Sequence, residues 1–342
     1  MIMREKPRET GRATFSRTLL VCGLLLAALA IVFITAAVIG SQRLPLAASL
    51  CALTGRSNCG LSPEQRAILF DLRLPRNLLA GAVGMCLAAA GAGYQALLRN
   101  PLAEPYLLGV SNGAAVGTMT ALVFFGAYEW SRPLMAFAGA LAATFVVYQL
   151  ARGRAGATPE RLILAGIIVT TFLSSAIVFI TTLMDATRIR SFTFWLLGDL
   201  SGTTSRLLGV ALVGAAIGVG ILVINARSLN LMMLGERDAF DLGVEVGRVR
   251  LTVFAAASLL VGASVASSGS VGYVGLVVPH LVRLSFGSDN RLVIPAAALA
   301  GASFVIVADT LSRTIIAPRE LPVGAITALI GAPLFIYLLR RG

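Results

Sequence analysis

Long apolar segments, separated by short polar loops, recur from one end of the chain to the other. Each holds about 20 residues, enough for a helix to cross a hydrocarbon core of roughly 30 Å. The pattern predicts spans at residues 18–40, 77–98, 106–126, 133–151, 162–184, 207–226, 251–267, 270–286, 292–312 and 321–339. Only Ser268-Gly269-Ser270 separates two short segments, so the count is nine or ten. We predict an all-α polytopic membrane protein with about ten transmembrane helices, forming one domain over residues 1–342.

Composition and charge agree with a lipid-embedded chain. The sequence is 57% hydrophobic and 13% charged, against roughly 25% charged residues in soluble domains. The first apolar segment is too long for a secretory signal and no small-residue cleavage site follows it, so we interpret it as a retained helix. Most basic residues fall on one side of the membrane when both termini, including a basic tail at residues 1–17, are placed in the cytosol, as the positive-inside rule requires.

The net charge of +12 is spread over short loops on both faces of the membrane. This distribution favours topology signals and contact with lipid headgroups over nucleic-acid binding. An unusual group of arginines nevertheless remains on the outer side. It includes Arg43, Arg56, Arg73, Arg76, Arg188 and Arg313.

Several kinds of chemistry are excluded by the residue inventory. Lys6 is the only lysine, so the chain cannot hold a phosphate-binding loop of the GxxxxGK[ST] type. If transport uses ATP, another chain must hydrolyse it. His280 is the only histidine and no cysteine pair has CxxC spacing, so we expect no metal site and no cofactor.

The four cysteines divide into two groups. Cys22 and Cys86 lie within predicted spans, where thiols pack as small apolar groups. Cys51 and Cys59 share a loop on the outer side. An oxidising compartment would join them in a disulfide, and an unbonded thiol pair is the alternative that the sequence leaves open.

Asp309 is the ionisable residue that comes closest to lying deep in a span. Arg313 follows it by one helical turn, and this spacing predicts a local i,i+4 ion pair. Proton relays need carboxylates or paired charges at mid-membrane, and an intramembrane enzyme needs a catalytic pair in a span. The pattern therefore disfavours an ion-coupled secondary transporter and an enzyme.

Three segments interrupt the simple alternation of spans and loops. Residues 99–113 combine prolines, asparagines and glycines at the edge of an apolar stretch, which predicts a broken helix near a pathway. Residues 225–250 form the longest inner loop, and apolar Ala239 and Leu242 among acidic residues predict a short amphipathic helix closed by Gly243. Aromatic residues at 192–195 indicate an interfacial belt or a short helix at the mouth of the pathway.

Small residues also recur with the spacing Gly113-xxx-Gly117 and Gly214-xxx-Gly218. Such spacing is typical of helices that approach each other closely within a membrane. We predict that both pairs lie on packing faces of a tight bundle.

Six motifs occur in order along the chain. They are Leu72-Arg73-Leu74-Pro75-Arg76; Gln95-Ala96-Leu97-Leu98-Arg99-Asn100-Pro101-Leu102-Ala103-Glu104-Pro105; Leu108-Gly109-Val110-Ser111-Asn112-Gly113-Ala114; Phe194-Trp195-Leu196-Leu197-Gly198; Val271-Gly272-Tyr273-Val274-Gly275-Leu276-Val277-Val278-Pro279-His280-Leu281-Val282-Arg283; and Glu320-Leu321-Pro322-Val323-Gly324. Together they resemble the FecCD/BtuC family, the permease subunits of ABC importers for iron chelates, haem and vitamin B12. The resemblance extends from about residue 70 to the end, whereas the first 70 residues are generic.

The resemblance implies a BtuC-like ABC importer permease fold with ten transmembrane helices. It also implies a homodimer around a central path, cytosolic ABC ATPase subunits and a periplasmic substrate-binding protein. The expected location is the bacterial inner membrane. ATP hydrolysis would lie on the separate ATPase chain, which agrees with the missing lysine loop, so no catalytic residue is expected here.

Individual residues also take roles from the resemblance. Arg73, Arg76 and Arg313 match positions that dock acidic residues of the binding protein, where complementary charge steers encounter and fixes register. For Arg43, Arg56 and Arg188 we keep headgroup pairing as the interpretation. The residues that match the family's ATPase coupling helix are Gly235, Glu236, Ala239, Leu242 and Gly243.

The translocation path and the substrate are less sharply defined by the resemblance. Asn100, Pro101 and Leu102 match the region near the inner gate, and we place Trp195 at the mouth of the path. His280 belongs to a motif at an inner helix end and is interpreted as structural. The expected substrate is an iron chelate, either a ferric siderophore or haem. Cobalamin is the alternative, and an ion-coupled secondary transporter is a weaker one.

Overall fold

The computed structural model describes residues 14–341 except 41, 43, 57–58, 126–129 and 154–155. Helices make up almost all of this part of the chain. The first half contains α1 (Phe15–Val38), α2 (Leu46–Leu53), α3 (Pro63–Ala67), the π-helical turn η1 (Ile68–Arg73), α4 (Leu74–Leu97), the 3-10 turn η2 (Pro105–Leu108), α5 (Val110–Phe124) and α6 (Ser131–Ala151). A hairpin of β1 (Arg152–Gly153) and β2 (Gly156–Ala157) follows. The second half contains α7 (Pro159–Thr182), α8 (Ala186–Leu196), α9 (Ser205–Ile224), α10 (Ala226–Leu234), α11 (Glu236–Asp241), α12 (Val246–Ser268), α13 (Val274–Phe286), α14 (Asn290–Thr314) and α15 (Val323–Arg341).

The predicted spans are confirmed one for one. Seven helices of the described chain, counting α3 to α4 as one, are long and apolar enough to cross a membrane. Three shorter apolar helices, α5, α13 and α15, account for the remaining segments. The uncertain division at Ser268-Gly269-Ser270 is a true break, since α12 ends at Ser268 and α13 begins at Val274. Gly269 has a φ of +69°, which an L side chain adopts at a cost.

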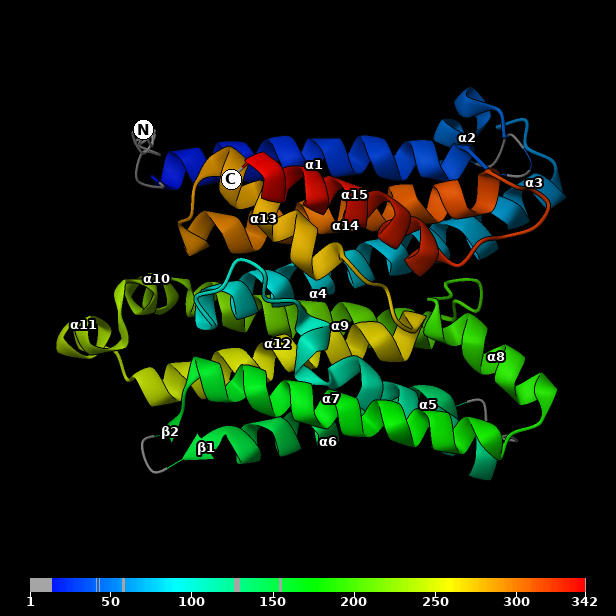
Figure 1. Ribbon diagram of the computed structural model, residues 1–342. Helices are drawn as coiled ribbons and strands as arrows, with labels where there is room; N and C mark the ends of the chain where they lie inside the picture. Colours follow the sequence, from blue (N-terminus) through cyan, green and yellow to red (C-terminus); the bar gives the residue numbers. More distant parts are fainter. Residues whose placement is uncertain are drawn as a thin grey trace.

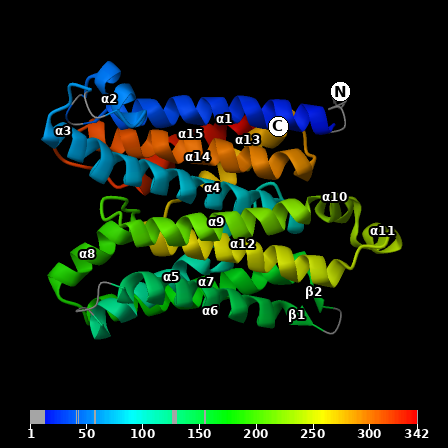
Figure 2. The ribbon, with the colours of Figure 1, turned by 180° about the vertical axis from the view of Figure 1, so that it is seen from behind.

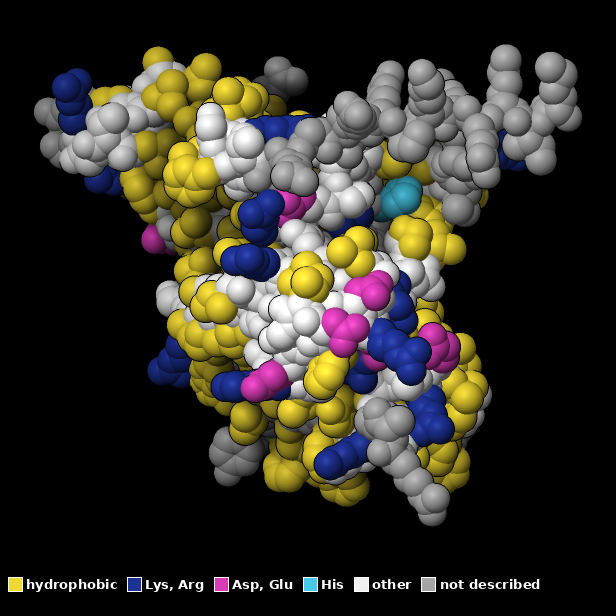
Figure 3. Space-filling view, turned by 90° about the vertical axis from the view of Figure 1, so that its left-hand side faces the viewer, with side chains coloured by type: hydrophobic (Ala, Val, Ile, Leu, Met, Phe, Trp, Pro, Cys, Tyr) yellow, Lys and Arg dark blue, Asp and Glu magenta, His cyan; other side chains and the backbone are white. Residues whose placement is uncertain are grey.

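The long helices run side by side, so that the molecule has two distinct ends (Figure 1). One end, hereafter the α11 end, carries the start of α1, the end of α15, the β hairpin, α10 and α11. The opposite end, hereafter the α8 end, carries α2, α3 and α8. The same arrangement is seen from behind in Figure 2. Figure 3 looks onto the α11 end, where charged side chains of both signs lie among hydrophobic ones.

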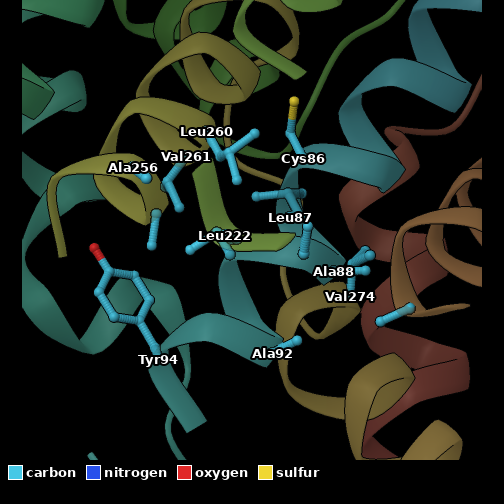
Figure 4. Close-up of a cluster of buried hydrophobic side chains, with 14 of the residues drawn as sticks. Cys86, Leu87, Ala88, Ala92, Tyr94, Leu222, Ala256, Leu260, Val261 and Val274 are labelled. Carbon is cyan, nitrogen blue, oxygen red and sulfur yellow. The ribbon is translucent and has the colours of Figure 1, made fainter. Parts of the chain in front are cut away.

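The core is built around α4, which packs against α9, α12, α13 and α14. Buried alanines and leucines of α4 meet Leu222, Leu260 and Val274 from three of these neighbours (Figure 4). The buried Tyr94 hydroxyl lies 2.6 Å from the hydroxyl of Ser258, so this polar atom is not left unpaired in the apolar core. Cys86 is buried in the same cluster, as an apolar group.

Small residues set how closely these helices approach. A Cβ on Gly113 would overlap the backbone of Gly139, and one on Gly117 would overlap the backbone of Met135, so α5 and α6 touch along this face. Likewise a Cβ on Gly214 or Gly218 of α9 would overlap side chains of α12. Both predicted glycine pairs are therefore packing faces, which is the role that small residues have between membrane helices.

Candidate docking faces and transport path

A buried cluster of charges at the α8 end joins α4 to α14 and to the loop that precedes α15. Arg76 Nη2 lies 2.9 Å from Asp309 Oδ1, and Arg76 Nη1 lies 2.9 Å from Glu320 Oε2. Arg313 Nε lies 3.1 Å from Asp309 Oδ2, which confirms the predicted i,i+4 ion pair. Arg313 Nη2 also donates to Asn77 Oδ1 at 2.9 Å. Asp309 thus lies between two guanidinium groups, an arrangement that offsets the cost of burying its charge.

Arg73 belongs to the same region but bonds differently. Its guanidinium donates to the carbonyl oxygens of Ala37 and Val38, at 3.0 Å and 2.7 Å, and to that of Gln42. These carbonyls come from the end of α1 and the residues after it. Arg73 therefore closes the last turn of α1, where backbone acceptors have no helical partner.

The three arginines that were predicted to dock a binding protein line one pocket. Its volume is about 410 Å³, and Asp71, Glu320 and Ser201 also line it. The structure brings Arg73, Arg76 and Arg313 together, but it also makes them largely buried and pairs each of them within the chain. Their docking role stays a prediction, and it now concerns a carboxylate that enters the pocket.

A small cap covers the start of α4 at this end. Cys51 and Cys59 form a disulfide within it, so the bonded alternative of the sequence analysis is the one observed. Ala37, Leu44 and Ala52 pack on Leu69 of η1 to form a separate apolar cluster. The cap thereby supports the segment that presents Arg73. Arg43, for which headgroup pairing was expected, lies outside the described residues.

At the α11 end, α10 and α11 form the loop at residues 225–250, whose coupling role stays a prediction. The N–H of Gly243 donates to Phe240 O at 2.9 Å, and the N–H of Val244 donates to Ala239 O at 2.9 Å. This pair of bonds is a Schellman motif, which requires a left-handed residue. Gly243 supplies it with a φ of +85°. The predicted closure of the helix at Gly243 is confirmed.

The exposed edge of α11 differs from the sequence expectation at one position. Ala239 is fully buried against the bundle, whereas Leu242 is 62% exposed. Phe240, to which the sequence analysis gave no role, is 70% exposed, and Leu234 of α10 is 71% exposed. Ala239 and Phe240 point in directions about 100° apart because they are neighbours on a helix. The apolar edge therefore consists of Leu234, Phe240 and Leu242.

Polar side chains fix this loop to the bundle. Asn230 of α10 donates to Asp289 Oδ1 at 2.7 Å, and its own Oδ1 accepts from the backbone N–H of Asn290 at 2.8 Å. Burial raises the pKa of the Asp289 carboxyl, but hydrogen bonds from Arg291 and Asn230 outweigh this and leave that pKa below its ordinary value. No local pattern points to Asn230, because its partners lie about 60 residues away along the chain.

A second link to the bundle is an ion pair at the beginning of α11. Glu236 of α11 pairs with the largely buried Arg250 of α12. Because α12 runs from this pair to the break at Gly269, which lies beside Trp195 of α8, one helix connects the loop to the α8 end.

The residues predicted near the inner gate form a tight turn after α4. Asn100 Oδ1 accepts from the N–H of Leu102 at 2.9 Å, which makes an Asx turn. Pro101 and Leu102 are exposed, while Asn100 is half-buried. Asn100 thus shapes the turn and Leu102 is the side chain that the turn presents. Whether these residues gate a path stays a prediction.

The segment after this turn binds the break between α12 and α13. Tyr106 donates through its hydroxyl to Val271 O at 3.0 Å and accepts from the N–H of Val271 at 2.9 Å. Glu104 accepts from the N–H of Tyr273 at 3.2 Å. Two irregular segments, 165 residues apart in sequence, therefore satisfy each other's backbone groups, as irregular backbone within a membrane requires. Both motifs were recognised in the sequence, but not their contact.

Trp195 lies in α8, so the predicted short helix exists at the α8 end. Its ring stacks on that of Phe192, with centroids 6.1 Å apart. A pocket of about 440 Å³ lies beside it, lined by Arg132, Asp199 and several hydroxyl and backbone groups that include Gly269. The pocket extends from α8 to the end of α12. Its lining mixes polar and apolar groups, and the place of Trp195 at the mouth of a path stays a prediction.

His280 lies in α13 with its ring edge-on to that of Phe335, at a centroid distance of 6.2 Å. It is half-buried. Within the described chain, no group of three or more His, Cys, Asp or Glu side chains is placed to hold a metal ion.

The fold and these sites define a class of protein: a polytopic permease with a charged pocket at one end and an exposed apolar edge at the other. Residues 28–341 match the FecCD transport family, and the chain belongs to this family of ABC importer permeases.

Relatives from archaea and bacteria match most of the chain. The cobalamin import system permease BtuC of Halobacterium salinarum is 40% identical over 88% of this chain and 80% of its own length. The hemin transport system permease HmuU of Yersinia pestis is 41% identical over 80% of this chain and 83% of its own. A solved inward-facing ABC transporter of the metal-chelate type superposes with a TM-score of 0.84 at 30% identity, covering 94% of this chain and 99% of that one.

Proposed function

We propose that two copies of this chain form the path of an ATP-driven importer that moves an iron chelate, a ferric siderophore or haem, from periplasm to cytoplasm. The observation that carries the proposal is the match of residues 28–341 to the FecCD transport family, and the surface of α7 adds to it. Thr171, Ser174, Ser175 and Thr182 are exposed along one side of this apolar span. Large apolar side chains, Ile168, Phe172 and Phe179, are exposed on the neighbouring side.

This division of α7 has a physical explanation if one side faces lipid and the other faces a path between two copies. Hydroxyl groups tolerate lipid when they bond to their own helix, as Thr171 does to Ile167 O at 2.9 Å. The side that carries the hydroxyls also exposes Leu164, Ile167 and Val178, so it is a mixed surface that would line a path only in part. Asn112 of α5 adds a polar group to the same side, donating to Ser174 Oγ at 2.8 Å.

The orientation in the membrane follows from the two ends. We place the α11 end, with both termini, in the cytosol and the α8 end in the periplasm. The Cys51–Cys59 disulfide lies at the α8 end, and disulfides persist in oxidising compartments such as the periplasm. The exposed edge of Leu234, Phe240 and Leu242 would then meet a cytosolic ATPase, which supplies the phosphate-binding lysine that this chain lacks.

At the periplasmic end, the pocket lined by Arg73, Arg76 and Arg313 would receive carboxylates of a soluble binding protein. Complementary charge of this kind mainly raises the association rate and fixes register. Because all three guanidiniums are already bonded within the chain, docking would exchange partners rather than satisfy free charges.

The identity of the chelate has weaker support than the importer function. Relatives are named for haemin and for cobalamin, so cobalamin remains the second candidate. The pocket beside Trp195, of about 440 Å³, does not distinguish between these chelates.

Uptake by proteoliposomes tests the proposal. The permease would be reconstituted with its ATPase and binding protein and supplied with ferric siderophores, haem or cobalamin. We expect uptake of one iron chelate. This uptake should require ATP on the side of the membrane at which the α11 end lies. Uptake of cobalamin alone would overturn the substrate, and uptake that needs a proton gradient instead of ATP would overturn the importer. Replacing Ser174 and Ser175 by leucine should reduce uptake, whereas Phe172→Leu, on the lipid side, should not.

A further inference from the structure

Glu320 occupies an unusual place in the charged cluster of the α8 end. Its carboxylate lies 2.9 Å from Arg76 Nη1, with side chains 45% and 12% exposed respectively. The other carboxylate on Arg76, that of Asp309, is 0% exposed. One acid of the cluster is thus locked in the protein, and the other reaches solvent.

The charges of the cluster balance. Arg76 and Arg313 carry two positive charges, and Asp309 and Glu320 carry two negative ones. Asp309 cannot leave without exposing two buried guanidiniums to an apolar environment, which is costly. Glu320 can leave, because water solvates its carboxylate, but Arg76 then needs another anion.

Glu320 also lies at a junction of cavities and helices. Together with Arg76 it lines both the arginine pocket of about 410 Å³ and a smaller one of about 130 Å³ beside α8. It directly precedes the turn into α15, where the N–H of Gly324 donates to Leu197 O at 3.0 Å. The Arg76–Glu320 pair therefore stands between the arginine pocket and the contact of α8 with α15.

We propose that Glu320 is an internal competitor that holds the position of a binding-protein carboxylate on Arg76 until docking displaces it. The inference rests on the proposed docking role of the arginine pocket. The incoming carboxylate takes the place of Glu320 on Arg76 Nη1, Asp309 keeps its bonds, and the charge balance around Arg76 is conserved. Glu320 moves into solvent, and the turn at residues 320–322 loses its tie to α4.

The exchange explains why a buried, fully paired cluster suits a docking site. An uncompensated guanidinium in the empty permease would destabilise the fold and would attract any anion. With Glu320 in place, the empty permease is stable, and a partner binds only if it offers a carboxylate at the right position. The competition lowers the affinity of the permease for its binding protein, but it also rejects other anions. Specific interfaces commonly use competing contacts in this way.

The decisive experiment compares Glu320→Gln with Asp71→Asn in the full permease, each titrated with the binding protein that supports uptake. Both substitutions remove one negative charge from the same pocket, but among the described contacts only Glu320 pairs with an arginine. We expect Glu320→Gln to tighten docking by about two- to fivefold, the worth of a partly exposed ion pair, and Asp71→Asn by less than about 1.5-fold. The difference should persist at high salt, because long-range steering is screened there and a direct exchange is not.

The Arg76→Gln background supplies the second test. The gain from Glu320→Gln should vanish there, since no guanidinium remains to be competed for. Equal gains from Glu320→Gln and Asp71→Asn, or a gain that survives in Arg76→Gln, would overturn the exchange and leave the docking role intact. If the Arg76 variant does not fold, the first comparison decides alone.

The proposed docking role fails in a recognisably different way. If Arg76→Gln binds the protein as tightly as the wild type does and still carries out uptake, then the arginine pocket is not the docking site. That result overturns the competitor role as well. Hydrogen exchange gives an independent reading: in the wild type, docking should increase amide exchange at residues 320–322, and in Glu320→Gln this region should exchange fast without the partner.

Discussion

The α8 end and the α11 end differ in the surface that they offer to a partner. At the α8 end, Arg76 and Arg313 already bond to Asp309 and Glu320 within the chain. At the α11 end, Phe240 and Leu242 are 70% and 62% exposed in the described part of the chain. A partner at the first end must compete with internal carboxylates, while one at the second end only has to displace water. The first favours selectivity and reversibility, and the second favours a lasting association.

The largest effect on this comparison should come from Asp309→Asn. The amide keeps the shape of the carboxylate but cannot neutralise Arg76 and Arg313, which are both largely buried. Removing one partner of a buried ion pair costs about 3–5 kcal/mol. We expect a matching fall in the free energy of unfolding, measured in detergent micelles by denaturant titration. The control, Asp71→Asn in the same pocket, should change stability by less than about 0.5 kcal/mol. A stable Asp309→Asn variant would show that the cluster is not what holds α4 to α14.

At the α11 end, Phe240→Ser should leave stability unchanged and weaken association with the ATPase. Burying a phenylalanine in a partner's cleft contributes about 1.5–3 kcal/mol, so we expect association about tenfold weaker or more, measured by titrating the ATPase onto the reconstituted permease. Asp241→Ser is the matched control, because Asp241 is exposed on the same helix but is not part of the apolar edge. If Asp241→Ser has the larger effect, the contact is electrostatic and the apolar edge does not make it.

The two ends also differ in how much of them the sequence could predict. Local spacing was sufficient for the spans, for the Asp309–Arg313 pair and for the end of α11 at Gly243, because each depends on residues within one or two helical turns. The same spacing predicted the packing faces at Gly113 and Gly214. These features follow from helix geometry alone.

Contacts between distant segments were beyond the sequence. Arg76 meets Asp309 across 233 residues, and Asn230 meets Asp289 across 59. The periodicity of the sequence does not predict contacts of this kind, because they depend on how whole helices pack against each other. The charges themselves suggested an exposed docking surface, whereas burial and internal pairing became visible only in the fold. Phe240 was not predicted for a local reason. Asp238 and Asp241 flank it in sequence, and the spacing of Ala239 and Leu242 among acidic residues predicted that those two form the apolar side of the helix.

Gly243→Ala sharpens the description of the α11 end by changing its shape rather than its surface. An alanine at a φ of +85° costs about 1 kcal/mol, which should loosen the end of α11 and weaken ATPase association by up to about fivefold. Gly247→Ala is the control, because Gly247 lies in α12 and a Cβ added there would meet no other atom within 4 Å. We expect it to bind the ATPase as the wild type does. Equal losses in both variants would mean that the Schellman turn has no special part in positioning Phe240 and Leu242.

The smallest expected effect concerns Asp289, which joins α10 to α14. Its pKa is lower in the folded protein than in an unfolded chain, where it is about 3.9. A carboxyl of this kind stabilises the fold at pH values above its unfolded pKa, and the contribution is lost as the pH falls through the lower, folded value. We expect the wild type to exceed Asp289→Asn in stability by about 0.2–1 kcal/mol at neutral pH, with the two converging below about pH 4. Thermal unfolding of both proteins between pH 7 and pH 3 measures the difference. A gap that persists at the acid end, where both side chains are neutral, would show that the difference does not come from the charge of Asp289. In that case the charged contact that fixes the α11 end would be the Glu236–Arg250 pair rather than Asp289.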